Sequence, residues 1–260
     1  MMPIPLSEVA QFVEENIGKF HERRLERLQN LKLKEVLKRK NPYLFKAKNI
    51  HVAHDLVKSL LDAFLSSQEE TVFGEFLEQL AIFVCKRAYG GRKSSSEGID
   101  LEFEKDGVVY LVSVKSGPNW GNSQQIKKMR SAFQKAIKTL RTNQPKINVQ
   151  AVNGCCYGKE YRDYGDYIKM CGQEFWTFIS GNERVYLDII EPLGHRAKER
   201  NEAFQREYAR IINLFTDEFS RDFCQNGMIN WEKLVAFNSE KRIRKKELNT
   251  KIHIPPLPEK

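Results

Sequence analysis

The chain lacks long apolar runs, paired cysteine motifs and a phosphate-binding glycine loop. No stretch approaches the ~18 apolar residues of a membrane-spanning helix, so we expect no membrane partner. The five cysteines form no Cys-x-x-Cys pair, which favours free buried thiols over a disulfide framework or a zinc site. Because Gly-x-x-x-x-Gly-Lys-Ser/Thr is missing, we expect no nucleotide cofactor. The absence of Gly-x-Ser-x-Gly weighs against an ordinary serine hydrolase.

What the chain does have is a globular composition with an excess of basic residues. Hydrophobic residues make up 41% and charged residues 30% of its 260 positions, which is typical of a folded protein. The net charge of +9 favours a polyanionic partner, although it does not separate DNA from RNA or a membrane surface. The first residues include Glu8, Glu14 and Glu15 and lack the basic-then-apolar order of a signal peptide, so we expect a cytoplasmic protein.

The strongest local pattern is Asp106-Gly107 between two alternating runs, which predicts a β-hairpin with a two-residue turn. Such a turn pairs Lys105 with Val108 and places Asp100 opposite Ser113. Because side chains alternate along a strand, Asp100, Ser113 and Lys115 should share one face. The other face is expected to be apolar and to carry Ile99, Leu101, Phe103, Tyr110, Val112 and Val114.

A carboxylate beside a lysine at a strand end suits metal-assisted cleavage of a phosphodiester bond. The Asp100 carboxylate would hold the metal, with the backbone carbonyl of Val114 as a further ligand. Lys115 would orient or help deprotonate the attacking water and offset phosphate charge. Oxygen ligands and a phosphate substrate favour Mg²⁺ as the cofactor.

A helix capped by Ser123 is predicted over residues 123–140, between a strand at 108–115 and a strand at 147–157. Strand, helix and strand in this order indicate a parallel pair joined by a crossover. The predicted fold class is therefore α/β (α+β), a mixed sheet flanked by helices with helical N- and C-terminal additions. The other expected elements are helices at 6–39, with Gly18 as a weak point and Pro42 as its stop, and at 52–67, 71–87, 173–179, 195–224 and 230–237, and a strand at 184–190.

The hairpin resembles the PD-(D/E)xK nuclease superfamily, in which an Asp opens one strand and an acid-x-Lys triplet lies on the next. Asp100 matches the first position and Lys115 the last, while Ser113 stands where an acid is usual. Lys40–Asn49 is also similar to the NPYLFxAKN segment of type II restriction endonucleases. Further segments recur in similar order in their PmeII-like branch, where Ser-x-Lys can replace acid-x-Lys: Thr71–Gly74, Ser113–Gly117, Gly172–Trp176 and Trp231–Leu234.

This resemblance implies a restriction-endonuclease-like core that cuts double-stranded DNA at a short site within a restriction–modification system. It also implies a second metal-binding acid, because one carboxylate holds a divalent ion poorly. Related nucleases take that acid from the helix before the hairpin, so Glu78 is the first candidate. Glu97, Glu102 and Glu75 follow as alternatives.

The expected organisation has three regions: a helical region at 1–50 for dimerisation or DNA clamping, a nuclease core at 51–193, and C-terminal helices with a basic tail at 194–260. Trp120 could stack on a base or serve as a loop anchor. The DNA-binding candidates are Arg92, Lys93, Asn119, Trp120, Asn122, Gln124, Lys127 and Lys128.

Cleavage of both strands at a palindromic site predicts a homodimer. The apolar stripes from Leu6 to Leu31 and from His195 to Cys224 exceed what a compact core obviously needs, so we expect them at the interface. Two alternatives stay open. One is a repair or recombination nuclease with the same core, and the other is a DNA-binding protein whose nuclease core has lost activity, for which Ser113 is the clue.

Overall fold

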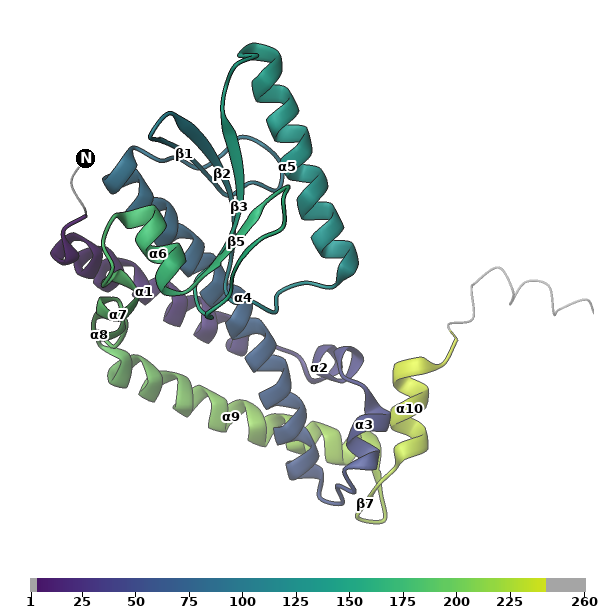
Figure 1. The fold of residues 1–260 in the computed structure, drawn as a ribbon. Helices are drawn as coiled ribbons and strands as arrows, with labels where there is room; N and C mark the ends of the chain where they lie inside the picture. The colour runs from purple at the N-terminus through teal and green to yellow at the C-terminus, as the bar shows by residue number, and fades with distance from the viewer. Residues whose placement is uncertain (1–3, 242–260) are drawn as a thin grey trace, which may run out of the picture. The chain divides into compact units, whose positions relative to one another are not determined.

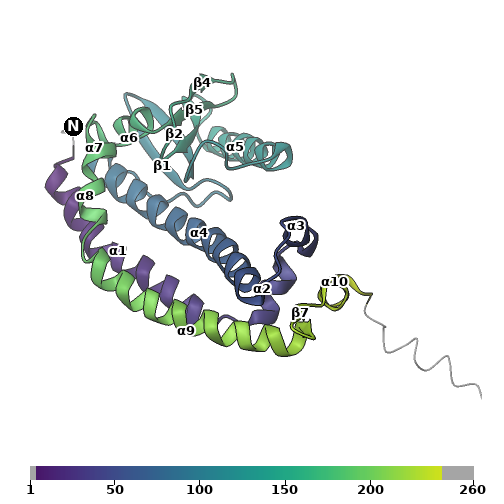
Figure 2. The same ribbon diagram turned by 90° about the horizontal axis from the view of Figure 1, so that it is seen from below.

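The structure is a computed structural model that describes residues 4–241, and these divide into two compact units (Figures 1 and 2). The first unit combines the described residues up to Gln29 with Leu65–Tyr208. The second combines Asn30–Phe64 with the described residues from Ala209 on. The three regions predicted from the sequence are not tested by this division and stay a prediction. Beyond Lys241, the predicted basic tail lies outside the described residues.

The sheet of the first unit consists of β1 (Leu101–Lys105), β2 (Val108–Lys115), β3 (Val149–Cys155), β4 (Tyr161–Asp163) and β5 (Ile168–Cys171). Its strand order is β1-β2-β3-β5-β4. The β1–β2 and β4–β5 pairs are antiparallel, whereas β2–β3 and β3–β5 are parallel. This mixed sheet confirms the predicted fold class. Sequence reasoning missed β4 and β5, because they are short and β4 is exposed throughout.

The hairpin has the predicted register. Lys105 pairs with Val108 and Leu101 with Val112, so the next position brings Asp100 opposite Ser113. Asp106 and Gly107 have φ values of 52° and 73°. Left-handed φ at both turn positions is the geometry that favours Asp-Gly, since its twist matches that of the flanking strands. The turn chemistry therefore determines which side chains meet at the far end of the hairpin.

Helices cover both faces of this sheet. On one face Val112 and Val114 pack in a cluster with Leu80 and Val84 of α4 (Ala53–Tyr89). The other helices of that cluster are α1 (Leu6–Gln29), α6 (Gln173–Ser180) and α7 (Val185–Asp188). Figure 1 shows α5 (Ser123–Asn143) along the opposite face.

The α5 face has its own apolar cluster, in which Leu111 and Ala151 pack with Met129 and Phe133. Ile99 also belongs to this cluster, so its predicted position beside Leu101 is wrong. The reason is that Ile99 precedes the first residue of β1, where strand alternation does not yet hold.

The remaining elements are α2 (Leu33–Arg39), α3 (Pro42–Ala47), α8 (Ile190–Leu193), α9 (Ala197–Phe223), β6 (Cys224–Gln225), β7 (Met228–Ile229) and α10 (Trp231–Ser239). Both α4 and α9 contribute residues to each unit. Among the residues described, no helix is long and apolar enough to cross a membrane.

Several predicted helices have different limits. The single helix at 6–39 is wrong: the chain leaves α1 after Gln29 and re-enters helix at Leu33, while Gly18 lies inside α1. Pro42 does not stop a helix but occupies the first turn of α3, with Asn41 as its N-cap. The two helices at 52–67 and 71–87 are one helix, α4, because the polar residues between them are compatible with helix.

Two further expectations are corrected. The strand at 184–190 is wrong, since the structure forms α7 and part of α8 there; a short apolar run does not by itself distinguish a buried helix from a strand. The cap of α5 is Asn122 rather than Ser123. The Asn122 side chain accepts hydrogen bonds from the backbone N–H groups of Gln124 and Gln125, and the Gln125 side chain accepts one from the backbone N–H of Asn122.

The apolar stripes expected at a dimer interface are largely buried within the chain itself. Val13 and Ile17 of α1 are at most 2% exposed, as are Phe215 and Phe219 of α9. The two helices therefore do not have the expected surplus of exposed apolar surface, and the predicted homodimer is supported by the symmetry of a palindromic site alone.

Gly154 provides a test of this packing. A Cβ added at Gly154 would lie 2.1 Å from the ring of Phe175, which is fully buried. Gly154→Ala should lower the free energy of unfolding by about 1–3 kcal/mol through overpacking, measured by chemical denaturation. The matched control is Gly74→Ala within α4, where the nearest atom is 3.8 Å away and a gain of about 0.5–1 kcal/mol is expected. Equal stabilities for the two variants would contradict the packing described here.

Candidate active site

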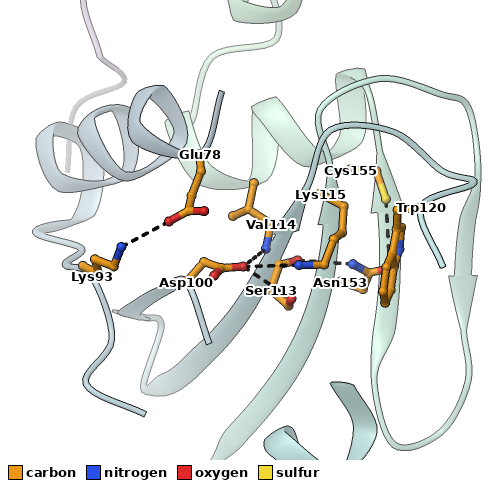
Figure 3. A network of polar contacts seen from close by, with 9 residues as sticks. All are labelled: Glu78, Lys93, Asp100, Ser113, Val114, Lys115, Trp120, Asn153 and Cys155. Carbon is orange, nitrogen blue, oxygen red and sulfur yellow. Dashed lines mark hydrogen bonds and ion pairs between the residues drawn. The ribbon is translucent and has the colours of Figure 1, made fainter. Parts of the chain in front are cut away.

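The carboxylate of Asp100 is held at the open end of the hairpin. Its backbone N–H donates to the carbonyl of Val112 (2.9 Å), and its Oδ2 accepts a hydrogen bond from the N–H of Val114 (2.7 Å). Asp100 lies one residue before β1, and its side chain adds one more hydrogen bond to the β1–β2 pairing. Together these contacts fix Asp100 relative to β2, and Figure 3 shows the one between its carboxylate and Val114.

The side chains of Ser113 and Lys115 meet this carboxylate, as the predicted shared face requires. Lys115 Nζ lies 3.7 Å from Asp100 Oδ2, and Ser113 Oγ lies 3.4 Å from the same oxygen. Ser113 is 1% exposed, whereas Asp100 and Lys115 keep about a quarter of their side chains open to solvent (21% and 27%). The acid and the lysine are therefore both fixed and accessible.

Glu78 reaches toward the same end of the hairpin from α4. In Figure 3 its carboxylate points to the side where Asp100 and Val114 lie. Burial raises the pKa of the Cys156 thiol to about 12, and the negative charge of Glu78 contributes to that rise. Glu78 Oε1 also pairs with Lys93 Nζ at 3.3 Å, so the ammonium of this exposed lysine partly neutralises it.

The alternative acids are placed differently. Both carboxylate oxygens of Glu102 accept hydrogen bonds, one from Arg92 (2.7 Å) and the other from Ser94 (2.7 Å). Glu75 pairs with Arg23. Glu97 is exposed beside a cavity lined by Lys115. Glu78, by contrast, directs its carboxylate toward the side of Asp100 and Val114 (Figure 3).

The loop after β2 is anchored to the neighbouring strands. Trp120 donates its indole N–H to Oδ1 of Asn153 (3.1 Å), and its ring lies 5.2 Å from Lys115 Nζ. Lys169 Nζ donates to the carbonyl of Pro118 (3.0 Å) and pairs with Glu160 (2.6 Å). Of the two roles considered for Trp120, these contacts match a loop anchor.

Sequence reasoning missed Asn153 and Lys169. A signal for Asn153 existed, because it is the polar residue within the buried stretch 151–155 of β3. Lys169 lies in the short strand β5, whose sequence carries no comparable signal.

A cavity of about 450 Å³ lies next to Lys115 on the α5 face of the sheet. Its lining includes Ser113 of β2 and Trp120 of the following loop. The helix α5 contributes Lys128, Ser131 and Lys135. Three lysines around one cavity suit a phosphate-bearing ligand. A hollow of about 630 Å³ elsewhere on α5 lacks an acid–lysine pair of this kind, because its one carboxylate, Asp166, is bound by Arg130.

The DNA-binding candidates fall into two groups. Arg92, Lys93, Trp120 and Asn122 engage Glu102, Glu78, Asn153 and the start of α5, respectively. The others are exposed around the N-terminal part of α5: Asn119, Gln124, Lys127 and Lys128. Contacts of either group with DNA stay a prediction.

The donor set at the hairpin end fits a hard divalent cation. A strand residue directs its N–H and C=O to the same neighbour, so the carbonyl of Val114 faces the side of β2 where Asp100 lies. With the two carboxylates this makes an oxygen-only set, and Mg²⁺ typically uses one or two carboxylates and keeps several waters. Within residues 4–241, no group of three or more His, Cys, Asp or Glu side chains is placed to hold a metal ion, as a zinc site would require.

Comparison with known proteins adds one result. Residues 7–201 match the family of the Type II restriction endonuclease EcoO109I. The matched span includes the hairpin, the Glu78 helix and the loop that carries Trp120. No individual curated protein matches the chain.

Proposed function

The chain belongs to the family of the type II restriction endonuclease EcoO109I, and from this premise we propose that it is a Mg²⁺-dependent enzyme that hydrolyses both strands of double-stranded DNA at a short specific site. We further propose that it acts as a homodimer in a restriction–modification system. The observation that carries the catalytic part of the proposal is the convergence of Asp100, Ser113 and Lys115 at one end of the β1–β2 hairpin.

Each group at this site has an assigned task in the proposal. Asp100, Glu78 and the Val114 carbonyl would hold the cation. When bound, the cation would lower the pKa of the attacking water and offset charge on the phosphate. Lys115 would orient the attacking water and share the phosphate charge, because its ammonium lies between Asp100 and the open cavity. The lysines of α5 would hold the flanking DNA backbone.

Ser113 occupies the position where the PD-(D/E)xK pattern usually has an acid. Its hydroxyl is buried and lies beside Asp100, so an acid at this position would add a second negative charge in an enclosed place. We propose that Glu78 supplies the missing carboxylate from α4. Membership of that superfamily and of the PmeII-like branch is part of this proposal.

Plasmid digestion with Mg²⁺ separates the proposal from its alternatives. Discrete bands are expected for a restriction enzyme. A smear would indicate a general nuclease of the same fold, and retarded DNA without cleavage would indicate a binding protein with a degraded site. Mapping the ends of the discrete fragments would then give the recognition sequence.

The first functional prediction concerns the acid and the lysine. Asp100→Asn and Lys115→Ala should each reduce the cleavage rate by at least about a hundredfold, since charge stabilisation worth about 3 kcal/mol or more is removed. Binding of the mapped site should persist in a mobility-shift measurement without Mg²⁺.

The same hairpin offers matched controls at its other end. Asp106→Asn preserves the left-handed turn position, because Asn tolerates that conformation, and Lys105→Ala removes a lysine from the same strand pair. Both should cut at the wild-type rate. A near wild-type rate for Asp100→Asn or Lys115→Ala would refute the site assignment.

The second prediction concerns the second carboxylate. Glu78→Gln keeps the shape of the side chain but removes the charge that attracts the cation, so the Mg²⁺ concentration for half-maximal cleavage should rise by about tenfold or more. Glu75→Gln, on the same helix but paired with Arg23, is the control and should leave the metal requirement unchanged. An unchanged requirement in Glu78→Gln would move the ligand to Glu97.

The third prediction concerns the oligomeric state. Two-fold symmetry matches a palindromic site and brings one hairpin to each strand. Light scattering should therefore give about twice the 30.4 kDa chain mass. A monomer both free and on its DNA site would refute the dimer and favour a nicking enzyme.

A further inference from the structure

Asn153 is a buried amide in the middle of the central sheet. It is 1% exposed and lies in β3 between Val152 and Gly154, where the ladder to β2 and β5 uses the backbone and not the side chain. A buried amide without partners costs roughly 1–3 kcal/mol, so the burial of Asn153 requires hydrogen-bond partners for its side chain.

Both ends of the Asn153 amide are used. Its Nδ2–H donates to the backbone carbonyl of Ser113 (3.2 Å), and its Oδ1 accepts the indole N–H of Trp120 (3.1 Å). An indole N–H only donates, so the oxygen of the amide must face Trp120 and the orientation of the amide is determined. Asn153 thus joins the strand that carries Ser113 and Lys115 to the loop that follows it (Figure 3).

The Trp120 ring transmits this contact to Lys115. Lys115 Nζ lies 5.2 Å from the ring centroid, within the range of a cation–π interaction. A lysine side chain has a flexible four-carbon stem, so a second neighbour besides Asp100 restricts where its ammonium can sit. The ring itself is half-buried and packs against the apolar cluster under α5.

We infer that Asn153 is a positioning residue for DNA cleavage, which acts through the Trp120 indole to hold the Lys115 ammonium beside Asp100. This inference rests on the proposed nuclease function and names a residue that acts on the reaction without touching the reacting atoms. A merely structural role for Asn153 would lower stability or DNA binding and leave the turnover of bound DNA unchanged.

The kinetic test uses three variants of the full chain. Asn153→Ala removes the amide, Trp120→Phe keeps an aromatic ring without the N–H, and the third variant combines both changes. Each single change should lower kcat by about tenfold to a hundredfold, as expected for a displaced catalytic group, while KM stays within about twofold. Because both residues act in one chain of contacts, the double variant should be no slower than the slower single variant. If the double variant lost kcat by the product of the two single losses, the inference would be overturned. A raised KM with unchanged kcat would overturn it as well.

A spectroscopic test checks the contact itself. The chain has three tryptophans, so a ¹⁵N-labelled sample gives three indole N–H resonances, and Trp120→Phe identifies the one from Trp120. Asn153→Ala should shift that resonance and leave Trp176 in place, because the Trp176 indole donates to the carbonyl of Cys156. An unmoved Trp120 resonance would overturn the inference. If Asn153→Ala does not fold, Trp120→Phe carries the kinetic test alone.

Ser180→Ala is the matched control. Ser180 is another fully buried polar residue, and its hydroxyl donates to the carbonyl and accepts from the N–H of Asn182 in the turn at the end of α6. This variant should lose stability but keep kcat and all three indole resonances. The proposed function and the role of Asn153 are tested by different outcomes. If the wild-type chain does not cut DNA with Mg²⁺, the nuclease function is refuted. If the wild type cuts and Asn153→Ala cuts equally fast, only the positioning role is refuted.

Discussion

The candidate site depends on the register of β1 against β2. The Asp-Gly turn sets the pairing from Lys105 and Val108 onward, and a shift by one residue would place Asp100 on the opposite face from Ser113 and Lys115. The Asp100 carboxylate then extends the ladder by accepting the Val114 N–H (2.7 Å). This one contact both adds a hydrogen bond at the open end of the hairpin and fixes the orientation of the carboxylate. Asp100 therefore has a structural role and a proposed chemical role through the same atom.

The remaining parts of the site come from elements that pack around this hairpin. The long helix α4 supplies Glu78, and the parallel neighbour β3 supplies Asn153 beneath the loop that follows Lys115. Glu102 and Glu75 pair with Arg92 and Arg23, and Glu78 pairs with the exposed Lys93. Because all three acids are ion-paired, the direction of the Glu78 carboxylate (Figure 3), and not freedom from a partner, supports Glu78 as the proposed ligand.

The sequence predicted those features whose cause is local. Alternation and turn chemistry predicted the hairpin, and helical spacing predicted α5, α6 and α9 within a few residues. It failed where local pattern is ambiguous: the apolar run from Arg184 to Ile190 is helical, and the polar stretch after Leu65 does not interrupt α4. The exposed strand β4 carries no alternating pattern, because neither of its faces is buried.

The sequence by itself determined that Asp100, Ser113 and Lys115 meet, because strand period and turn type depend on neighbouring residues only. It ranked Glu78 first among the candidate acids, ahead of Glu97, Glu102 and Glu75, but could not determine the direction of any of these side chains. Only the tertiary structure decided the direction of Glu78, the pairing of its competitors and the link from Asn153 through Trp120 to Lys115. These are contacts between segments far apart in the chain, so they follow from how helices and strands pack and not from the period of any one segment.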